Sequence, residues 1–283
     1  MIRETEGYVM QLQNFSVNDG DGVRTTVFLA GCPLDCIWCC NPEQKTCFDA
    51  AHKMTLAQVE ERIAGYALFF RRCGGGVTFS GGEATAQQGF LRAMTERFYD
   101  KGYDLTLETC GFFEFDQVRD ILEKMNRIFI DVKQMDAGLH EIFTGVGNAR
   151  ILDNLTRMQE ELSVPIVVRI PLIVGVNAEA EHIETLCRFL SQNAPRAALE
   201  FLPYHRFGED KYRELGMETP DARYRTALEE IRRQGLCVPG KGVCAAGAEE
   251  LSSEANMEIP DDAVLENCRR IAADHGILVV SYR

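Results

Sequence analysis

Three cysteines near the start of the chain form its most reactive group of side chains. Cys32, Cys36 and Cys39 lie four and then three residues apart, directly after the strand-like stretch 25–30. One loop can bring three thiolates at this spacing around a single metal centre. Thiolates are typical ligands of iron–sulfur clusters and of zinc, and three of them on a four-iron cube leave one iron open to another molecule. The spacing therefore predicts a 4Fe-4S cluster that takes part in chemistry.

A structural zinc site is the alternative for these cysteines. Such a site normally closes with four ligands, usually as two Cys-x-x-Cys or Cys-x-x-His halves separated by a longer loop. The sequence shows no second half of this kind. We therefore favour the iron–sulfur interpretation.

Other residues suited to ligand binding follow or interrupt apolar stretches. Gly81 and Gly82 would let a ligand approach the backbone, although Gly-Gly-Glu alone is usually only a turn. Asp131 and Lys133 should point to the same side, because residues two apart share one face of a strand. They can hold a zwitterion or form a surface ion pair of little energy, and the spacing alone slightly favours the ion pair. Arg169 lies inside an apolar stretch, so it requires a carboxylate or a ligand.

The chain resembles a known family when its other motifs are added. The spacing Cys-x3-Cys-x2-Cys is similar to the signature of radical S-adenosylmethionine (radical SAM) enzymes, whose open iron binds the cofactor's amino and carboxylate groups. The whole set resembles the activating enzymes of glycyl radical enzymes, especially the pyruvate formate-lyase activating enzymes. The further motifs are Asp19-Gly-Asp-Gly-Val-Arg24, Ser80-Gly-Gly-Glu83, Asp131-Val-Lys133 and Leu202-Pro-Tyr-His205.

This resemblance implies which residues meet the cofactors. Cys32, Cys36 and Cys39 would hold the cluster, and the Gly-Gly-Glu motif would lie at the methionyl amino group of S-adenosylmethionine. The implied cofactor contacts are Trp38, Cys40, Gly82, Glu83, Asp131, Val132, Lys133, Arg169 and His205. The eight-cysteine ferredoxin insert that many of these activating enzymes carry is absent, so we expect a single cluster.

The resemblance also implies a monovalent cation site formed by Glu108, Thr109 and Asp131. Glu108 replaces the aspartate of those activating enzymes, and its longer side chain would shift or abolish the site. Two other departures from the family pattern are Asp21, where proline is usual, and Cys40, where histidine commonly follows the third ligand. Neither departure removes a cluster ligand.

The chain contains 11 cysteines, and we expect those outside the cysteine loop to be reduced thiols. Free cysteines are commonly buried, and we expect ordinary buried thiols at Cys47, Cys73, Cys110, Cys187 and Cys268. Cys237 and Cys244 form one more closely spaced pair, beside glycines.

The elements that position these residues are predicted by the alternation of short apolar stretches with longer helical ones, which is typical of an α/β protein with a parallel sheet. The expected strands are 25–30, 77–79, 105–107, 128–130, 166–169 and 199–202, and the expected helices are 55–71, 87–99, 115–125, 150–162 and 179–193. Six strand–helix units are too few for a closed eight-stranded barrel, but right-handed crossovers bring their carboxyl ends to one face. The family resemblance likewise implies an open, partial (β/α)6 barrel, here a single domain over residues 1–283.

Residues 220–250 are predicted to be an insertion in that domain. The segments 220–235 and 260–276 both begin with proline and end with glycine, as helices often do. The stretch 259–282 resembles the terminal helix and strand of the activating enzymes, which leaves residues 220–250 as the extra piece. Inserted segments usually lie on the surface. This one is either a passive excursion or, because its helix is basic, a docking surface for a protein partner.

Composition limits the classes of partner. The formal net charge of −13 disfavours a broad nucleic-acid interface. The longest apolar stretch, 164–176, is too short to span a bilayer. With no apolar signal segment at the amino terminus and an odd number of cysteines, we expect a monomer in the cytoplasm.

The function that the resemblance implies is that of an anaerobic oxidoreductase. A flavodoxin- or ferredoxin-like reductant would supply one electron to the cluster. S-adenosylmethionine would be cleaved to methionine and a 5'-deoxyadenosyl radical, which would abstract hydrogen from a glycine of a partner glycyl radical enzyme. One alternative is a radical SAM enzyme that acts on a small molecule or a peptide precursor. Another is a non-catalytic iron–sulfur or zinc protein that senses redox state.

Overall fold

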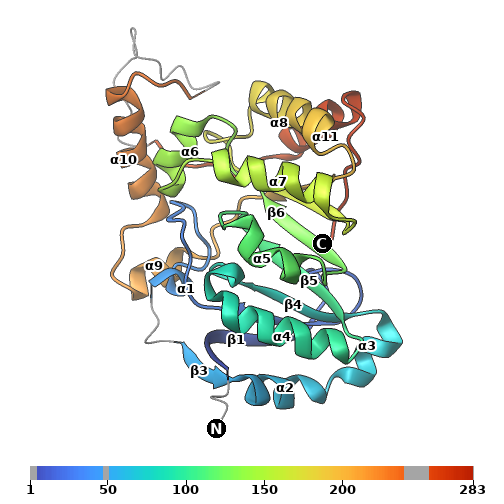
Figure 1. Ribbon diagram of the computed structural model, residues 1–283. Helices are drawn as coiled ribbons and strands as arrows, with labels where there is room; N and C mark the ends of the chain where they lie inside the picture. The colour runs from blue at the N-terminus through green and yellow to red at the C-terminus, as the bar shows by residue number, and fades with distance from the viewer. Residues whose placement is uncertain (1–4, 47–50, 239–254, 283) are drawn as a thin grey trace.

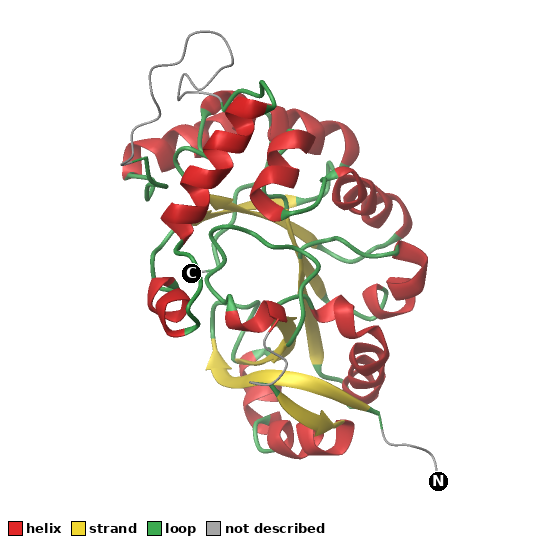
Figure 2. Ribbon diagram, turned by 90° about the vertical axis from the view of Figure 1, so that its left-hand side faces the viewer, coloured by secondary structure: helices red, strands yellow, loops and turns green. Residues whose placement is uncertain are grey.

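The computed structural model describes residues 5–46, 51–238 and 255–282. In this part of the chain the strands form one eight-stranded sheet in the order β3-β1-β2-β4-β5-β6-β7-β8. The strands are β1 (Glu6–Ser16), β2 (Arg24–Leu29), β3 (His52–Thr55), β4 (Gly76–Gly81), β5 (Asp104–Thr109), β6 (Arg127–Asp131), β7 (Ile166–Leu172) and β8 (Ala198–Pro203). Figure 2 shows the sheet curving beside a central group of loops, with helices along its outer side.

The parallel part of the sheet contains the six strands that the sequence predicts. β2 pairs with β4, and each strand from β4 to β7 pairs with the next one, always in parallel. The carboxyl ends of all six strands therefore meet at one rim. Within the described ranges the two outermost strands, β3 and β8, do not pair with each other. The predicted open, partial barrel is confirmed.

The edge formed by β1 and β3 was not predicted. Both strands run antiparallel to their neighbours, and the register of β1 against β2 shifts twice. Six successive residues of β1, from Met10 to Phe15, include no buried side chain. Strands are recognised by strict alternation of buried and exposed residues, so a strand with two irregularities and little burial gives a weak signal.

The helices cover the sheet largely where the sequence places them. They are α1 (Glu43–Thr46), α2 (Leu56–Ala64), α3 (Ala67–Cys73), α4 (Gln88–Asp100), α5 (Phe115–Leu122), α6 (Ala137–Thr144), α7 (Ala149–Glu161), α8 (Ala180–Asn193), α9 (Glu209–Glu214), α10 (Pro220–Arg233) and α11 (Asp262–Asp274), with a short 3-10 helix, η2 (Ala84–Gln87). The single helix predicted over 55–71 is wrong, because the chain turns at Gly65 and Tyr66 between α2 and α3. Val59, Ile63 and Phe70 of this segment are nevertheless buried.

The buried apolar side chains form two clusters. The larger cluster lies between the sheet and its covering helices. The smaller one joins the cysteine loop to α6 and α10, through Leu34, Phe143 and Tyr224 among others. Burying one large apolar side chain stabilises a fold by about 1.5–3 kcal/mol, so this second cluster fixes the loop that carries the three cysteines.

The carboxyl-terminal part differs from expectation in two ways. α10 buries Tyr224, Leu228 and Ile231, so its helix is part of the core and not the surface excursion expected of an insertion. After α11, the chain forms a single bridge between Leu199 and Val279 instead of a full strand beside β8. Residues 239–250 of the predicted insertion lie outside the described ranges, as do Cys47 and Cys244. Among the described helices, none has the length and apolar character needed to cross a membrane.

Candidate functional site

A cavity of about 290 Å³ opens at the carboxyl-terminal rim of the parallel strands. Its lining combines the cysteine loop with residues from the ends of β4 to β8. The predicted site residues that line it are Cys32, Trp38, Cys36, Cys39, Cys40, Gly82, Glu83, Glu108, Thr109, Asp131, Lys133, Arg169 and His205. Val132 instead belongs to the larger apolar cluster, because successive residues of a strand face opposite sides.

The cysteine loop is held by backbone hydrogen bonds on both sides of the cavity. The amide of Gly31 donates to the carbonyl of Gln44 at 2.7 Å, and the amide of Asp35 donates to the carbonyl of Thr144 at 2.7 Å. Burial raises the pKa of the Cys36 thiol to about 11 and that of Cys39 to about 12. These thiols are therefore protonated at neutral pH without a metal, and metal binding must release their protons.

The glycine pair has a structural role at the start of this loop. A Cβ on Gly82 would overlap the carbonyl oxygen of Gly31, and a Cβ on Gly81 would overlap the backbone of Leu29. Gly81 also adopts a φ of 124°, which side-chain-bearing residues rarely adopt. The pair is thus required for the close packing of β4 against β2 and the cysteine loop, in addition to any approach by a ligand.

Glu83 is buried and accepts four hydrogen bonds. Its Oε1 receives the amide and the hydroxyl of Thr85 at 3.0 and 2.7 Å and the hydroxyl of Thr109 at 2.8 Å. Its Oε2 receives the amide of Cys110 at 2.6 Å. This carboxylate caps η2 and ties the end of β4 to the end of β5. Glu83 is therefore a brace of the cavity wall.

Asp131 and Lys133 form a close ion pair at the end of β6. Lys133 Nζ lies 2.6 Å from Asp131 Oδ2, and both residues line the cavity. Although burial favours the neutral amine, the charge of Asp131 raises the pKa of Lys133 above its usual value. The two side chains point to the same side, as their spacing predicts, and they present one positive and one negative charge to the cavity.

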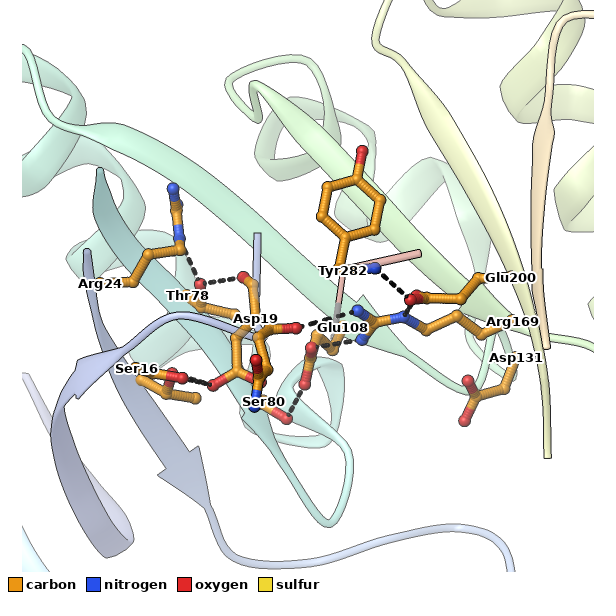
Figure 3. A network of polar contacts seen from close by, with 12 residues as sticks. Ser16, Asp19, Arg24, Thr78, Ser80, Glu108, Asp131, Arg169, Glu200 and Tyr282 are labelled. Carbon is orange, nitrogen blue, oxygen red and sulfur yellow. Dashed lines mark hydrogen bonds and ion pairs between the residues drawn. The ribbon is translucent and has the colours of Figure 1, made fainter. Parts of the chain in front are cut away.

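Arg169 of β7 is held by two carboxylates at the base of the cavity (Figure 3). Its Nε donates to Glu200 at 2.7 Å and its Nη1 donates to Glu108 at 2.6 Å. Its guanidinium also lies 3.5 Å from the ring centre of Phe129. Despite burial, these carboxylates raise the pKa of Arg169. The carboxylate or ligand that the sequence predicts for Arg169 is thus supplied by carboxylates of the protein itself, and the arginine side chain still lines the cavity.

The residues implied as a cation site are each engaged with other neighbouring residues. Glu108 accepts from Arg169 through Oε1 and from the Ser80 hydroxyl through Oε2 at 2.6 Å. Burial raises the pKa of Glu108, and the charge of Arg169 opposes this effect. Thr109 donates its hydroxyl to Glu83. Arg169, which is shared with Glu200, therefore offsets part of the negative charge of Glu108.

His205 and Trp38 complete the rim of the cavity. His205 stacks on Phe207 with ring centres 4.5 Å apart, and the Phe207 side chain is 84% exposed. Trp38 is buried against Phe143, with ring centres 6.0 Å apart. An exposed aromatic ring beside a cavity mouth is the kind of surface that contacts another protein.

Cys110 is a site residue that the sequence analysis assigned only to the core. It is buried as predicted, but it also lines the cavity, as Cys32 does. The only signal for this role is its position directly after β5, at the same rim as the other site residues. Cys187 and Cys268 are buried as predicted, whereas Cys73 is exposed because it ends α3 on the solvent side. Cys237 is exposed as well.

Comparison with known proteins places this site in a family. Residues 26–190 match the model of the radical SAM superfamily. That match spans more than half of the chain. The chain belongs to the radical SAM superfamily.

Its relatives within the radical SAM superfamily are activating enzymes of glycyl radical enzymes. The chain is 33% identical to isethionate sulfite-lyase activating enzyme of Desulfovibrio desulfuricans, over 76% of this chain and 88% of the relative. It is 30% identical to 4-hydroxyphenylacetate decarboxylase activating enzyme of Clostridioides difficile, over 76% and 87% of the two chains. A solved domain of pyruvate-formate lyase-activating enzyme from Bacteroides vulgatus superposes with a TM-score of 0.52 and 27% identity, over 73% of this chain and 98% of that domain.

The residues of this radical SAM protein fit the cofactors of its superfamily. Three thiols from one loop match a cluster with three protein ligands, and the adjacent Asp131–Lys133 pair suits a zwitterionic ligand. In the described ranges no three His, Cys, Asp or Glu side chains converge closely enough to hold one metal ion.

Proposed function

We propose that this protein activates a glycyl radical enzyme by removing a hydrogen atom from a glycine Cα of that partner. The observation that carries the proposal is the convergence of Cys32, Cys36 and Cys39 with the Asp131–Lys133 pair on one cavity. The relatives described above have activating functions of this kind. When bound, one 4Fe-4S cluster and S-adenosylmethionine would supply the electron and the radical chemistry, as cofactors do for reactions beyond side-chain chemistry.

The side chains have separate roles in this proposal. The three cysteines hold the cluster, and Lys133 with Asp131 receives the carboxylate and amino groups of the cofactor. The remaining cofactor contacts are proposed at Trp38, Cys40, Gly82 and His205, with the backbone of Val132 at the same strand end. Glu83 and Arg169 are hydrogen-bonded inside the wall, so they position the strand ends on which those contacts lie. A monovalent cation at Glu108 stays a prediction.

The partner and the reductant belong to this proposal too. The relatives activate different glycyl radical enzymes, so the identity of the partner must come from experiment. We propose a flavodoxin- or ferredoxin-like reductant and a monomeric enzyme. Because oxygen would quench a radical reaction, we also propose that the protein works in the reducing cytoplasm.

The deciding experiment detects the product on the partner. Reconstituted protein is incubated without oxygen with S-adenosylmethionine, a chemical reductant and a candidate glycyl radical enzyme, and electron paramagnetic resonance is recorded. We expect a glycyl radical signal that is lost with Cys36→Ala and with alanine at the partner's radical glycine. Cofactor cleavage without a radical in any candidate partner would favour a small-molecule or peptide substrate. A cluster whose spectrum ignores S-adenosylmethionine would favour a redox sensor.

A further inference from the structure

α10, which the sequence assigns to an extra segment, reaches the cysteine loop. The helix packs beside α6 (Figure 1), and its Arg223 points inward with a side chain that is 16% exposed. Arg223 Nη2 donates to Asp35 Oδ2 at 2.7 Å and to the Asp35 carbonyl at 3.1 Å. Its Nη1 donates to the carbonyl of Cys36 at 3.3 Å. One guanidinium therefore holds both backbone and side chain of the loop between the first two cysteines.

The carboxylate that Arg223 holds is shared with a second cation. Lys45 pairs with the other oxygen of Asp35. Asp35 thus joins α10 to the residues that follow the loop through one ion pair on each carboxylate oxygen.

α10 itself is fixed, so the guanidinium is held in place before the loop binds metal. The hydroxyl of Tyr224, the next residue, donates to the carbonyl of Gly175 at 2.8 Å, and its ring stacks on Phe143. At the start of the helix, Asp221 pairs with Arg206 at 2.7 Å. A nearby hydroxyl, that of Tyr212 in α9, donates to the carbonyl of the third cysteine, Cys39, at 2.9 Å.

These contacts reduce the basic surface on which a docking role for α10 would depend. Arg223 faces the loop, Arg225 donates to Asn256 at 2.9 Å, and Arg233 pairs with Glu230 at 2.6 Å. The helix is basic by composition, but part of its positive charge serves contacts within the chain.

We propose that Arg223 is a positioning residue for the cluster: it fixes the loop between Cys32 and Cys36 and places a fixed positive charge beside it. This inference rests on the proposed cluster at the three cysteines. Hydrogen bonds that involve a charged group are stronger than neutral ones, so the loop loses its anchor when the guanidinium is removed. The potential of an iron–sulfur cluster depends on nearby charge and hydrogen bonds, and a positive charge favours the more negative reduced state.

The test compares variants of the full-length, reconstituted protein. Arg223→Ala removes the anchor and the charge, and Arg223→Lys keeps only the charge. Arg225→Ala removes an arginine two residues away that donates to Asn256 instead of the loop. The measurements are iron content, the rate of iron release to a chelator, and the reduction potential followed by electron paramagnetic resonance. Circular dichroism confirms that each variant is folded.

Three results are expected. Arg223→Ala removes all three hydrogen bonds that the guanidinium donates to the loop. It should release iron at least about tenfold faster, since the loss of one charged hydrogen bond already corresponds to that factor, and its cluster should have a more negative potential. Arg223→Lys should release iron faster than the parent but keep its potential, and Arg225→Ala should match the parent in both. Because lysine is the milder change, Arg223→Lys remains decisive if the alanine variant fails to fold.

Other outcomes would overturn the inference. Parent-like iron release in Arg223→Lys, whatever the alanine variant does, would refute the anchoring role. An unchanged potential in a folded Arg223→Ala variant would refute the electrostatic role. A parent protein that holds the cluster but forms no glycyl radical would contradict the proposed function alone, since none of these measurements depends on a partner.

Discussion

Replacing Glu83 with glutamine tests whether the Gly-Gly-Glu motif braces the cavity wall. The carboxylate is 2% exposed and accepts four hydrogen bonds. In Glu83→Gln one oxygen becomes an amide nitrogen, so one donor, such as the backbone N–H of Cys110, would face another donor. Losing a hydrogen bond to a charged group costs about 1.5–3 kcal/mol. The remaining bonds also weaken, because their acceptor no longer carries a charge.

This loss is partly offset, since a neutral amide costs less to bury than a carboxylate. We therefore expect the free energy of unfolding to fall by about 2 kcal/mol. With a urea m-value of about 3 kcal/mol per molar, the midpoint should fall by about 0.7 M. Urea unfolding followed by circular dichroism measures this shift, provided that the slope is unchanged.

Glu96→Gln is the matched control, because it makes the same chemical change on the exposed side of α4. Exposed substitutions of this kind usually change stability by less than about 0.5 kcal/mol. If Glu83 served only as a cofactor contact, Glu83→Gln would weaken S-adenosylmethionine binding and leave the urea midpoint where it was. A midpoint within 0.2 M of the parent, a limit of about 0.6 kcal/mol, would therefore refute the bracing role.

Three further predictions follow from the site. Cys36→Ala should abolish iron binding whereas Cys40→Ala should keep about four irons per chain, as colorimetric iron analysis would show; the reverse pattern would contradict the ligand assignment. Arg169→Met should lower the free energy of unfolding by about 3–5 kcal/mol, because it leaves two buried carboxylates without their cation, and adding Glu200→Gln should restore part of that loss in urea unfolding; no restoration would argue against the pairing. His182 accepts a hydrogen bond from the amide of Met135, and burial lowers its pKa from 6.5 to about 4. The stabilisation from neutral His182 is complete above pH 6.5. As pH falls toward 4 this part of the free energy of unfolding, up to about 3 kcal/mol, is lost. His182→Gln should therefore flatten the pH dependence of thermal unfolding between pH 6.5 and 4, and an equally steep dependence would refute the assignment.

Local patterns in the sequence were sufficient for the parallel core and for several side chains that meet at the cavity. Three cysteines in one loop meet the same cavity because so short a segment cannot separate them, and Asp131 with Lys133 shares a face because strands alternate. Likewise, apolar stretches long enough for a strand or a helix identified the six parallel strands. Such features depend only on residues a few positions apart, so they can be predicted from the sequence alone.

Patterns of this kind failed where the local signal was interrupted. The edge strand β1 has two register shifts and few buried residues, and the helix expected over 55–71 is divided by a turn at Gly65. In β1 the spacing of apolar residues was too irregular to indicate a strand, and over 55–71 it continued through a turn that it could not indicate. Contacts with neighbouring elements hold both segments in place, and the spacing does not record those contacts.

Only the tertiary structure decided which side chains act together across the sheet. Arg169 meets Glu108 and Glu200, which lie 61 and 31 residues away in sequence, and Arg223 reaches Asp35 across 188 residues. No periodicity relates such positions, because their distance is set by how strands and helices pack. The sequence alone thus determined the chemistry that the chain can carry. Packing determined which charged side chains form ion pairs within the protein and which still face the cavity.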